Sequence, residues 1–183
     1  LCRSTIYQGL SATRRTLLHG RVAELLDEMG NPQPGETAIH YARAGNSPGA
    51  ALRARQAADR ALESGAMAEA AYFLQLVVEN VGDATLKAEA TADLARALHM
   101  NREITRANPM LELAASRLRA VGRHDRAIRM DIRRVEGLAR VRLRALVGAG
   151  GLLDLVGLRV DEVVALGGAR EAVHRVQAGV EPL

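Results

Sequence analysis

Arginine is the residue type in this chain whose number and spacing could support chemistry, namely the binding of negatively charged groups. Between residues 117 and 144, ten arginines face three acidic residues, so this stretch carries a net charge of +7, whereas the whole chain carries +4. On a helix with about 100° per residue, five of these arginines fall within a stripe roughly 60° wide. This arginine stripe, which we predict to bind a partner, consists of Arg126, Arg129, Arg133, Arg140 and Arg144.

The chemistry of the stripe suits two classes of partner. A row of guanidinium groups can bind the phosphates of a nucleic acid or the carboxylates of an acidic protein domain. No aromatic residue lies between these arginines, which disfavours stacking on single-stranded bases. We therefore expect an acidic protein partner and keep nucleic-acid binding as the alternative. A third interpretation is a solvated face of an arginine-rich protein.

The other reactive side chains form no catalytic or metal-binding pattern. The five histidines are His19, His40, His99, His124 and His174. None lies four residues from another, the spacing that places two histidines on one helix face for a metal. His124 and Asp125 are adjacent, so on a helix their side chains point about 100° apart. Cys2 is the single cysteine, and Ser11 and Ser47 occupy positions typical of helix caps. We predict a protein that is not an enzyme and needs no cofactor or metal.

The composition restricts both the core and the compartment. Only 2% of the residues are aromatic, so the core must consist of Leu, Val, Ile and Ala, which favours close-packed helices. The few rings, at Tyr7, Tyr41, Tyr72 and Phe73, are expected to be core residues. A single cysteine allows no internal disulfide, and no signal peptide or membrane-spanning run is visible. We predict a cytoplasmic protein that does not enter a membrane.

The elements that must position the stripe are helices, and the clearest two span residues 50 to 81 with a hinge at Gly65. Small and aliphatic residues recur at helical spacing on both sides of the hinge: Ala57, Ala58, Ala61 and Leu62 before it, and Ala70, Leu74 and Val77 after it. Such residues let two helices approach closely, as in a tetratricopeptide hairpin. A hairpin of this kind needs stacked neighbours to bury its apolar face, so we predict a helical array.

Turn signals divide the chain at about one-helix intervals. Those signals are Gly30, Gly45, Gly65, Gly82, Asn101 and Gly122, each suited to a left-handed helix C-terminus. The helices predicted to start at Ala50 and Ala84 lie 34 residues apart, which is the tetratricopeptide period. The prolines predict a loop over 31–35, a cap at Ser47 followed by Pro48, and a helix that starts at Asn108-Pro109.

Two helices at the ends of the predicted array complete the pattern. The first starts after Ser11 and carries Leu18, Val22, Leu25, Leu26 and Met29 on one face. The last runs from Gly122 to about Val147, with an apolar face made of Ile128, Ile132, Val135, Ala139, Leu143 and Leu146. The predicted fold class is therefore all-α, a tetratricopeptide-like stack of helical hairpins. We divide the chain into a linking helix (1–30), helical repeats (31–147) and a Gly- and Val-rich, weakly helical tail (148–183).

Two segments carry a resemblance to a known family. The matching positions of the first are Tyr7, Leu10, Ser11, Arg15, Leu18, His19, Val22 and Ala23. They resemble the segment after the winged-helix part of bacterial signal-transduction ATPases, the LuxR-type and cyclase-linked regulators. Residues 38–45 resemble the short helix that opens the tetratricopeptide array of these regulators, and the hairpin at Gly65 follows in the same order. The resemblance covers residues 1 to 121.

The resemblance implies a function when the family's missing motifs are considered together with the array. The chain has no G-x4-GK[ST] phosphate loop and no segment like the family's DNA-reading helix-turn-helix. It would then be the interaction or effector-sensing arm of such a regulator, without the ATPase core and the DNA-binding domain. The expected partners are a protein or a small effector in the helical groove, together with the regulator's own winged-helix and ATPase domains.

Overall fold

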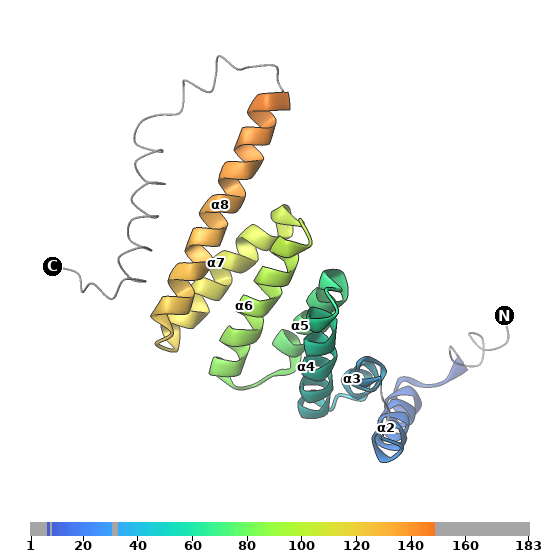
Figure 1. Cartoon of the computed structure of the whole chain (residues 1–183). Coiled ribbons are helices and arrows are strands. Elements are labelled where there is room, and N and C mark those ends of the chain that lie inside the picture. The colour runs from blue at the N-terminus through green and yellow to red at the C-terminus, as the bar shows by residue number, and fades with distance from the viewer. Residues whose placement is uncertain (1–6, 8, 31–32, 149–183) are drawn as a thin grey trace.

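The computed structural model describes residues 7, 9–30 and 33–148 of the chain, and within these residues the protein is all-helical. The described part of the chain contains seven helices in a row, each packed against the next in sequence (Figure 1). They are α2 (Ala12–Glu28), α3 (Pro34–Arg43), α4 (Ser47–Glu63), α5 (Met67–Asn80), α6 (Ala84–Met100), α7 (Ile104–Ala120) and α8 (His124–Gly148). The prediction of an all-α helical array is confirmed, whereas nothing tests the predicted domain boundaries. None of the described helices is long and apolar enough to cross a membrane.

Short polar caps and left-handed residues set the helix ends. The side chain of Ser11 accepts a hydrogen bond from a backbone N–H group in the first turn of α2, as predicted, and the side chain of Asp83 does the same for α6. Gly45, Gly65 and Gly122 have φ values of 74°, 77° and 76°, a conformation that glycine adopts without a Cβ penalty. Three-residue links therefore turn α3 into α4, α4 into α5 and α7 into α8.

Two predicted turn residues, Gly82 and Asn101, do not adopt the left-handed conformation. After α6 it is Arg102 that has a φ of 63°, while Asn101 stays at −74° as the C-cap. Gly82 follows Val81, whose ψ of 130° already leads α5 into an extended link. The turn at Arg102 therefore strains a residue that carries a Cβ.

The hairpin around Gly65 has the core that its sequence predicts. Its buried members are Ala54, Ala57, Ala58 and Ala61 on α4, and Ala70, Ala71, Phe73, Leu74, Val77 and Val78 on α5. Leu62, predicted to belong to this core, is only partly buried. A Cβ added to Gly35 of α3 would lie 2.4 Å from Cζ of Phe73, so α3 packs directly against the tip of this ring. Small residues thus let three helices approach closely.

The prediction that the aromatic residues are all core is wrong for two of them. Tyr72 is 56% exposed and Tyr7 is 41% exposed, while Phe73 is buried. Tyr41 is half-buried and donates a hydrogen bond of 2.8 Å to Asp27. Because Tyr72 and Phe73 are consecutive on α5, only one ring can face the core.

Three helix starts near prolines, those of α3, α4 and α7, differ from the predictions. The loop prediction for 31–35 is wrong at its end, because α3 begins at Pro34, where the missing N–H costs nothing. Ser47 is the first helical residue of α4, and Asn46 is the cap, accepting from the Gly49 N–H. The step from α4 at residue 47 to α6 at residue 84 is therefore 37 residues rather than 34.

The largest boundary error concerns α7, which begins at Ile104 and contains Pro109. The helical hydrogen bonds start earlier, since the Glu103 carbonyl accepts from the Arg106 and Ala107 N–H groups. Pro109 cannot donate to the carbonyl of Thr105. Both residues are exposed, so water can satisfy that carbonyl and the helix continues.

The predicted apolar face of α8 is at most half-buried in the described part of the helix. Between residues 124 and 142, where the side chains of α8 are described, the buried residues are Ala127, Met130 and Gly137, whereas Ile128 is 44% exposed. Of the other predicted members, Ile132, Val135 and Ala139 are half-buried, and the side chains of Leu143 and Leu146 lie outside the described residues. Gly137 lets α8 approach α7 closely, because a Cβ at this position would lie 3.1 Å from the Asn108 side chain.

Candidate functional site

The first residue of the arginine stripe, Arg126, is used within the fold. Its guanidinium forms ion pairs with Glu89 and, at 3.6 Å, with Asp93, both on α6. Burial, followed by the charges of Arg129 and Arg55, lowers the pKa of Arg126. Arg126 therefore joins α8 to α6 and is only partly available to a partner.

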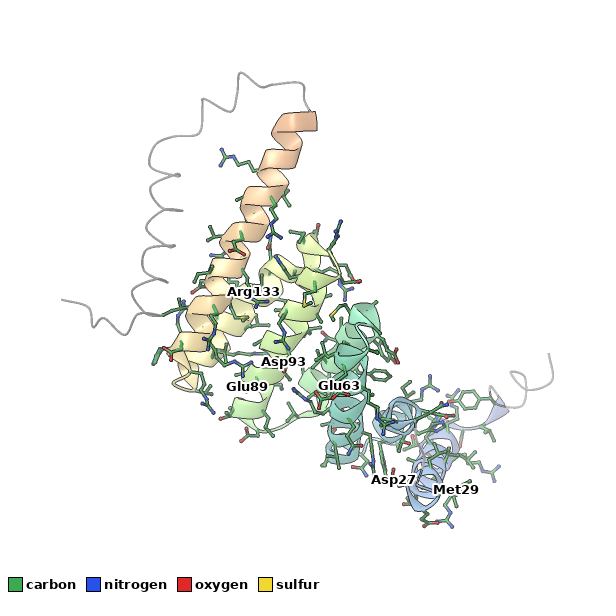
Figure 2. All side chains as sticks on the ribbon, in the orientation of Figure 1. Asp27, Met29, Glu63, Glu89, Asp93 and Arg133 are labelled. Atoms are coloured by element: carbon green, nitrogen blue, oxygen red, sulfur yellow. The ribbon has the colours of Figure 1, made fainter. Side chains whose placement is uncertain are left out.

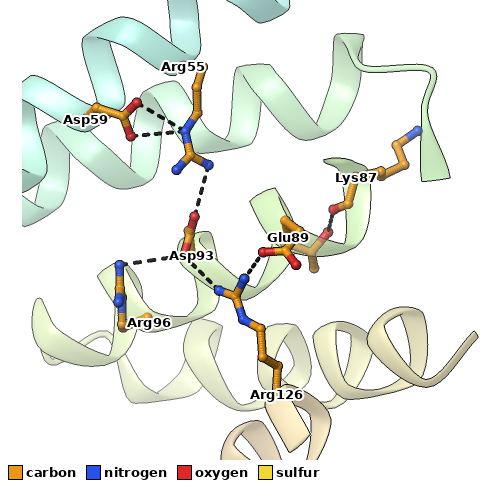
Figure 3. Close-up of polar contacts among 8 residues, drawn as sticks. Arg55, Asp59, Lys87, Glu89, Asp93, Arg96 and Arg126 are labelled. Carbon is orange, nitrogen blue, oxygen red and sulfur yellow. Dashed lines mark hydrogen bonds and ion pairs between the residues drawn. The ribbon is translucent and has the colours of Figure 1, made fainter. Parts of the chain in front are cut away.

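Asp93 is the centre of this polar network, shown in Figure 3. Its side chain is 10% exposed and lies 2.9 Å from Arg55 of α4 and 3.5 Å from Arg96 of its own helix. Burial lowers the pKa of Arg55. The charges and hydrogen bonds of Asp93 and Asp59 outweigh this effect, so the pKa of Arg55 is raised. One carboxylate thus connects α4, α6 and α8.

These contacts show that alternate helices of the array share one face. Arg55 crosses from α4 to α6, and Arg126 crosses from α8 to α6, without involving α5 or α7 (Figure 3). We name this the α4–α6–α8 face. It consists of Arg55, Asp59, Glu89, Asp93, Arg96, Arg126, Arg129, Arg133 and Arg140. Since six of these residues are arginines and three are acidic, the face is net positive.

The rest of the stripe follows the same side of α8. Arg129 and Arg140 are exposed and Arg133 is half-buried, and among the described residues no ion pair holds any of the three. Burial and the nearby charges of Arg140 and Arg133 lower the pKa of His99, which is near the end of α6. The side chain of Arg144 lies outside the described residues. The structure therefore brings four of the five predicted arginines to the α6 side of α8.

Sequence reasoning missed the acidic half of this site. Glu89 and Asp93 lie four residues apart on the predicted helix from residue 84, so they share one side of it. That spacing was the available signal, since a pair of carboxylates on one helix is a natural counterpart to an arginine row. Arg55 carried no comparable signal, because its contact to Asp93 spans 38 residues of sequence.

Two histidines that are distant in sequence meet between α2 and α3. The Nδ1 atoms of His19 and His40 lie 2.9 Å apart, and the Tyr7 hydroxyl lies 2.8 Å from Nε2 of His19. Burial, His40 and then Arg43 lower the pKa of His19. Both histidines therefore contribute to the packing of α2 on α3. Within the described part of the chain no group of three or more His, Cys, Asp or Glu could hold a metal.

The other side chains that the sequence analysis considered for chemistry add nothing to a site. His124 and Asp125 are both exposed at the start of α8. Cys2 and His174 lie outside the described residues.

A hollow of about 600 Å³ lies apart from the arginine stripe. Residues of α3, α4 and α5 line it, among them the apolar Pro34, Ile39, Ala57, Ala61 and Phe73. Glu36, Arg60 and Glu69 line the same hollow. Its volume falls in the range of small-molecule sites.

Comparison of the chain with family models, with curated proteins and with solved structures found no match.

Proposed function

We propose that this chain is a non-enzymatic interaction arm of a bacterial transcriptional or signalling regulator, a tetratricopeptide-like array acting in the cytoplasm. In this proposal the α4–α6–α8 face binds an acidic segment of a protein partner. The order of sequence segments that resembles the LuxR-type and signal-transduction ATPases supports the regulatory context. In that context the regulator's own ATPase and winged-helix domains would be neighbours of the arm.

One observation carries the choice of partner. Arg129, Arg133 and Arg140 follow one side of α8 over about 16 Å, without an ion-pair partner among the described residues. Arginines held at fixed spacing on a helix suit planar carboxylates, which they can bind through two hydrogen bonds each. An acidic segment lying along α8 would neutralise all three arginines.

Nucleic-acid binding is the alternative, and the use of Arg126 within the fold weighs against it. Three free arginines would neutralise about three phosphates, which gives weak affinity at physiological salt.

A binding experiment separates the two functions. Fluorescence anisotropy would compare a Glu-rich 15-residue peptide, a neutral peptide of the same length and a random 20-base-pair DNA duplex. We expect the acidic peptide to bind best, and reversal of Arg129, Arg133 and Arg140 to glutamate to weaken it at least about tenfold.

The matched control reverses three exposed arginines elsewhere, namely Arg14, Arg43 and Arg106. It changes the net charge equally, so it should leave most of the affinity in place. Equal binding of the acidic and neutral peptides would reject the proposal, and tighter binding of the duplex would favour the nucleic-acid function.

The hollow between α3, α4 and α5 supports a second candidate, the sensing of a small effector. Its apolar residues can bury an apolar ligand, and its charged residues can orient one. The fluorescent probe 8-anilinonaphthalene-1-sulfonate tests this directly. Replacing the half-buried Ile39 with Trp should fill the hollow and abolish the fluorescence gain; an unchanged gain would exclude the hollow as the binding site.

A further inference from the structure

The first helix of the array, α2, exposes an apolar stripe. Leu18 is 51% exposed, Val22 36%, Leu25 41% and Met29, at the C-cap, 80%. Figure 2 shows Met29 at the outer end of the row of helices. These residues, which we name the α2 stripe, are spaced by four, three and four positions, so they fall on one side of the helix over about 16 Å. This is the spacing by which two helices interlock side chains along a seam.

The residues that flank the α2 stripe are buried against α3 on one side and exposed and charged on the other. On one side His19 is buried and its Nδ1 lies 2.9 Å from that of His40, so this side is occupied by α3. On the other side Arg21 and Glu28 are exposed, one heptad apart. Arg21 makes only an exposed ion pair with Glu24 of its own helix, and among the described residues no ion pair holds Glu28. The open side therefore presents two residues of opposite charge, Arg21 and Glu28, beside the seam.

We propose that the α2 stripe binds the α2 stripe of a second copy of this chain, with the two helices antiparallel. In that arrangement Val22 packs on Leu25 of the second copy and Leu18 packs on its Met29, and the symmetry repeats each contact. Residues that flank the seam on the same side of both helices then become neighbours. Arg21 meets Glu28 of the second copy, and Glu28 meets its Arg21.

The position of α3 and the charges on the open side both favour the antiparallel pair over a parallel one. In a parallel pair each open side would instead face the side that already packs against α3, where His19 and Leu26 are buried or half-buried. The antiparallel pair keeps both copies of α3 on one side of the seam and both charged sides on the other. It therefore forms two complementary ion pairs without moving α3.

The size of the stripe predicts the strength of the association. Four side chains and the neighbouring Leu17, which is 68% exposed, would bury roughly 1,000 Å² in total, below the usual size of stable interfaces. We therefore expect a weak dimer that dissociates in the micromolar range.

Sedimentation equilibrium of the full chain tests the proposal. Between about 10 and about 500 µM, the apparent mass should rise from 19.6 kDa toward twice that value. Val22→Glu should abolish the rise, because it places a charge at the centre of the seam. Leu86→Glu, the same kind of change at an exposed leucine on α6, should leave the rise intact.

Exchange of the charges identifies the second copy as the occupant. Arg21→Glu and Glu28→Arg each create two like-charge contacts and should raise the dissociation constant at least about tenfold. The double variant R21E/E28R restores opposite charges and should return the constant to within about threefold of the original. A monomer at the highest concentration would overturn the proposal and leave the stripe to another segment or protein. A double variant no better than the single ones would overturn the antiparallel pairing.

Discussion

Replacement of Asp93 by asparagine should be among the most destabilising single changes on the α4–α6–α8 face. Asparagine keeps the shape of the side chain and removes its charge. Arg55, at 2.9 Å, and Arg126, at 3.6 Å, would then lose a carboxylate that is only 10% exposed. Arg126 retains Glu89, but Arg55 retains only the more exposed Asp59.

The magnitude follows from the burial of the partners. Removing one member of a fully buried ion pair costs about 3–5 kcal/mol, because the other charge stays buried and unpaired. Arg55 and Arg126 are 40% and 34% exposed, so water replaces part of the lost interaction. We expect the free energy of unfolding to fall by about 2 kcal/mol. For a chain of this size, that loss lowers the melting temperature by about 4–8 °C.

Thermal unfolding followed by circular dichroism measures this loss. Asp59→Asn is the matched control, because Asp59 also pairs with Arg55, at 3.0 Å, but is 48% exposed and on the same helix. That control should cost less than about 0.5 kcal/mol. The double variant R55Q/D93N should lose less than the sum of the single changes. Equal, small effects of D93N and D59N would refute the reasoning, since burial would then contribute nothing.

Three further outcomes test the packing, the turns and the histidine pair. Ala58→Leu, at a fully buried crossing of α4, should lower the free energy of unfolding by about 1–3 kcal/mol, whereas Ala68→Leu on the exposed side should not; thermal melts that show no difference would contradict the close crossing. Arg102→Gly should raise the same free energy by about 0.5–1 kcal/mol in urea titrations, and Gly122→Ala should lower it by about 1 kcal/mol, because both positions have positive φ. Burial, His40 and Arg43 hold the pKa of His19 below its ordinary value of 6.5, so the unfolded chain binds more protons as the pH falls below that value. Stability is therefore lost on acidification, and the drop in melting temperature between about pH 7.5 and about pH 5.5 should be larger in the original chain than in His19→Gln; equal drops would assign the effect to other groups.

Local chemistry explains which parts of the fold could be predicted. Ser11 and Asp83 cap helices because a short polar side chain can reach the backbone N–H groups of the next turn. Gly65 turns α4 into α5 because only glycine adopts its φ of 77° without strain. The alanines of that hairpin are buried because small residues at helical spacing permit a close crossing.

Long-range packing explains where the predictions failed. Pro109 by itself predicts a helix start. In the structure α7 begins at Ile104, just after the turn at Arg102. The helix continues through Pro109 because the exposed carbonyl of Thr105 needs no partner within the helix. The apolar face of α8 was assigned by residue type. Close approach to α7 instead selected Ala127 and Gly137 for the buried side.

The sequence by itself determined that this chain forms helices with aliphatic cores, where most of them begin, and that five arginines share one side of the last helix. Those properties depend on residues within a few positions of one another. The tertiary structure decided which arginines remain free, because Glu89 and Asp93 neutralise Arg126 from another helix. It also decided that the α2 stripe is exposed while His19 is buried against His40. A helix presents several faces, and only the packing of its neighbours determines which of them water can reach.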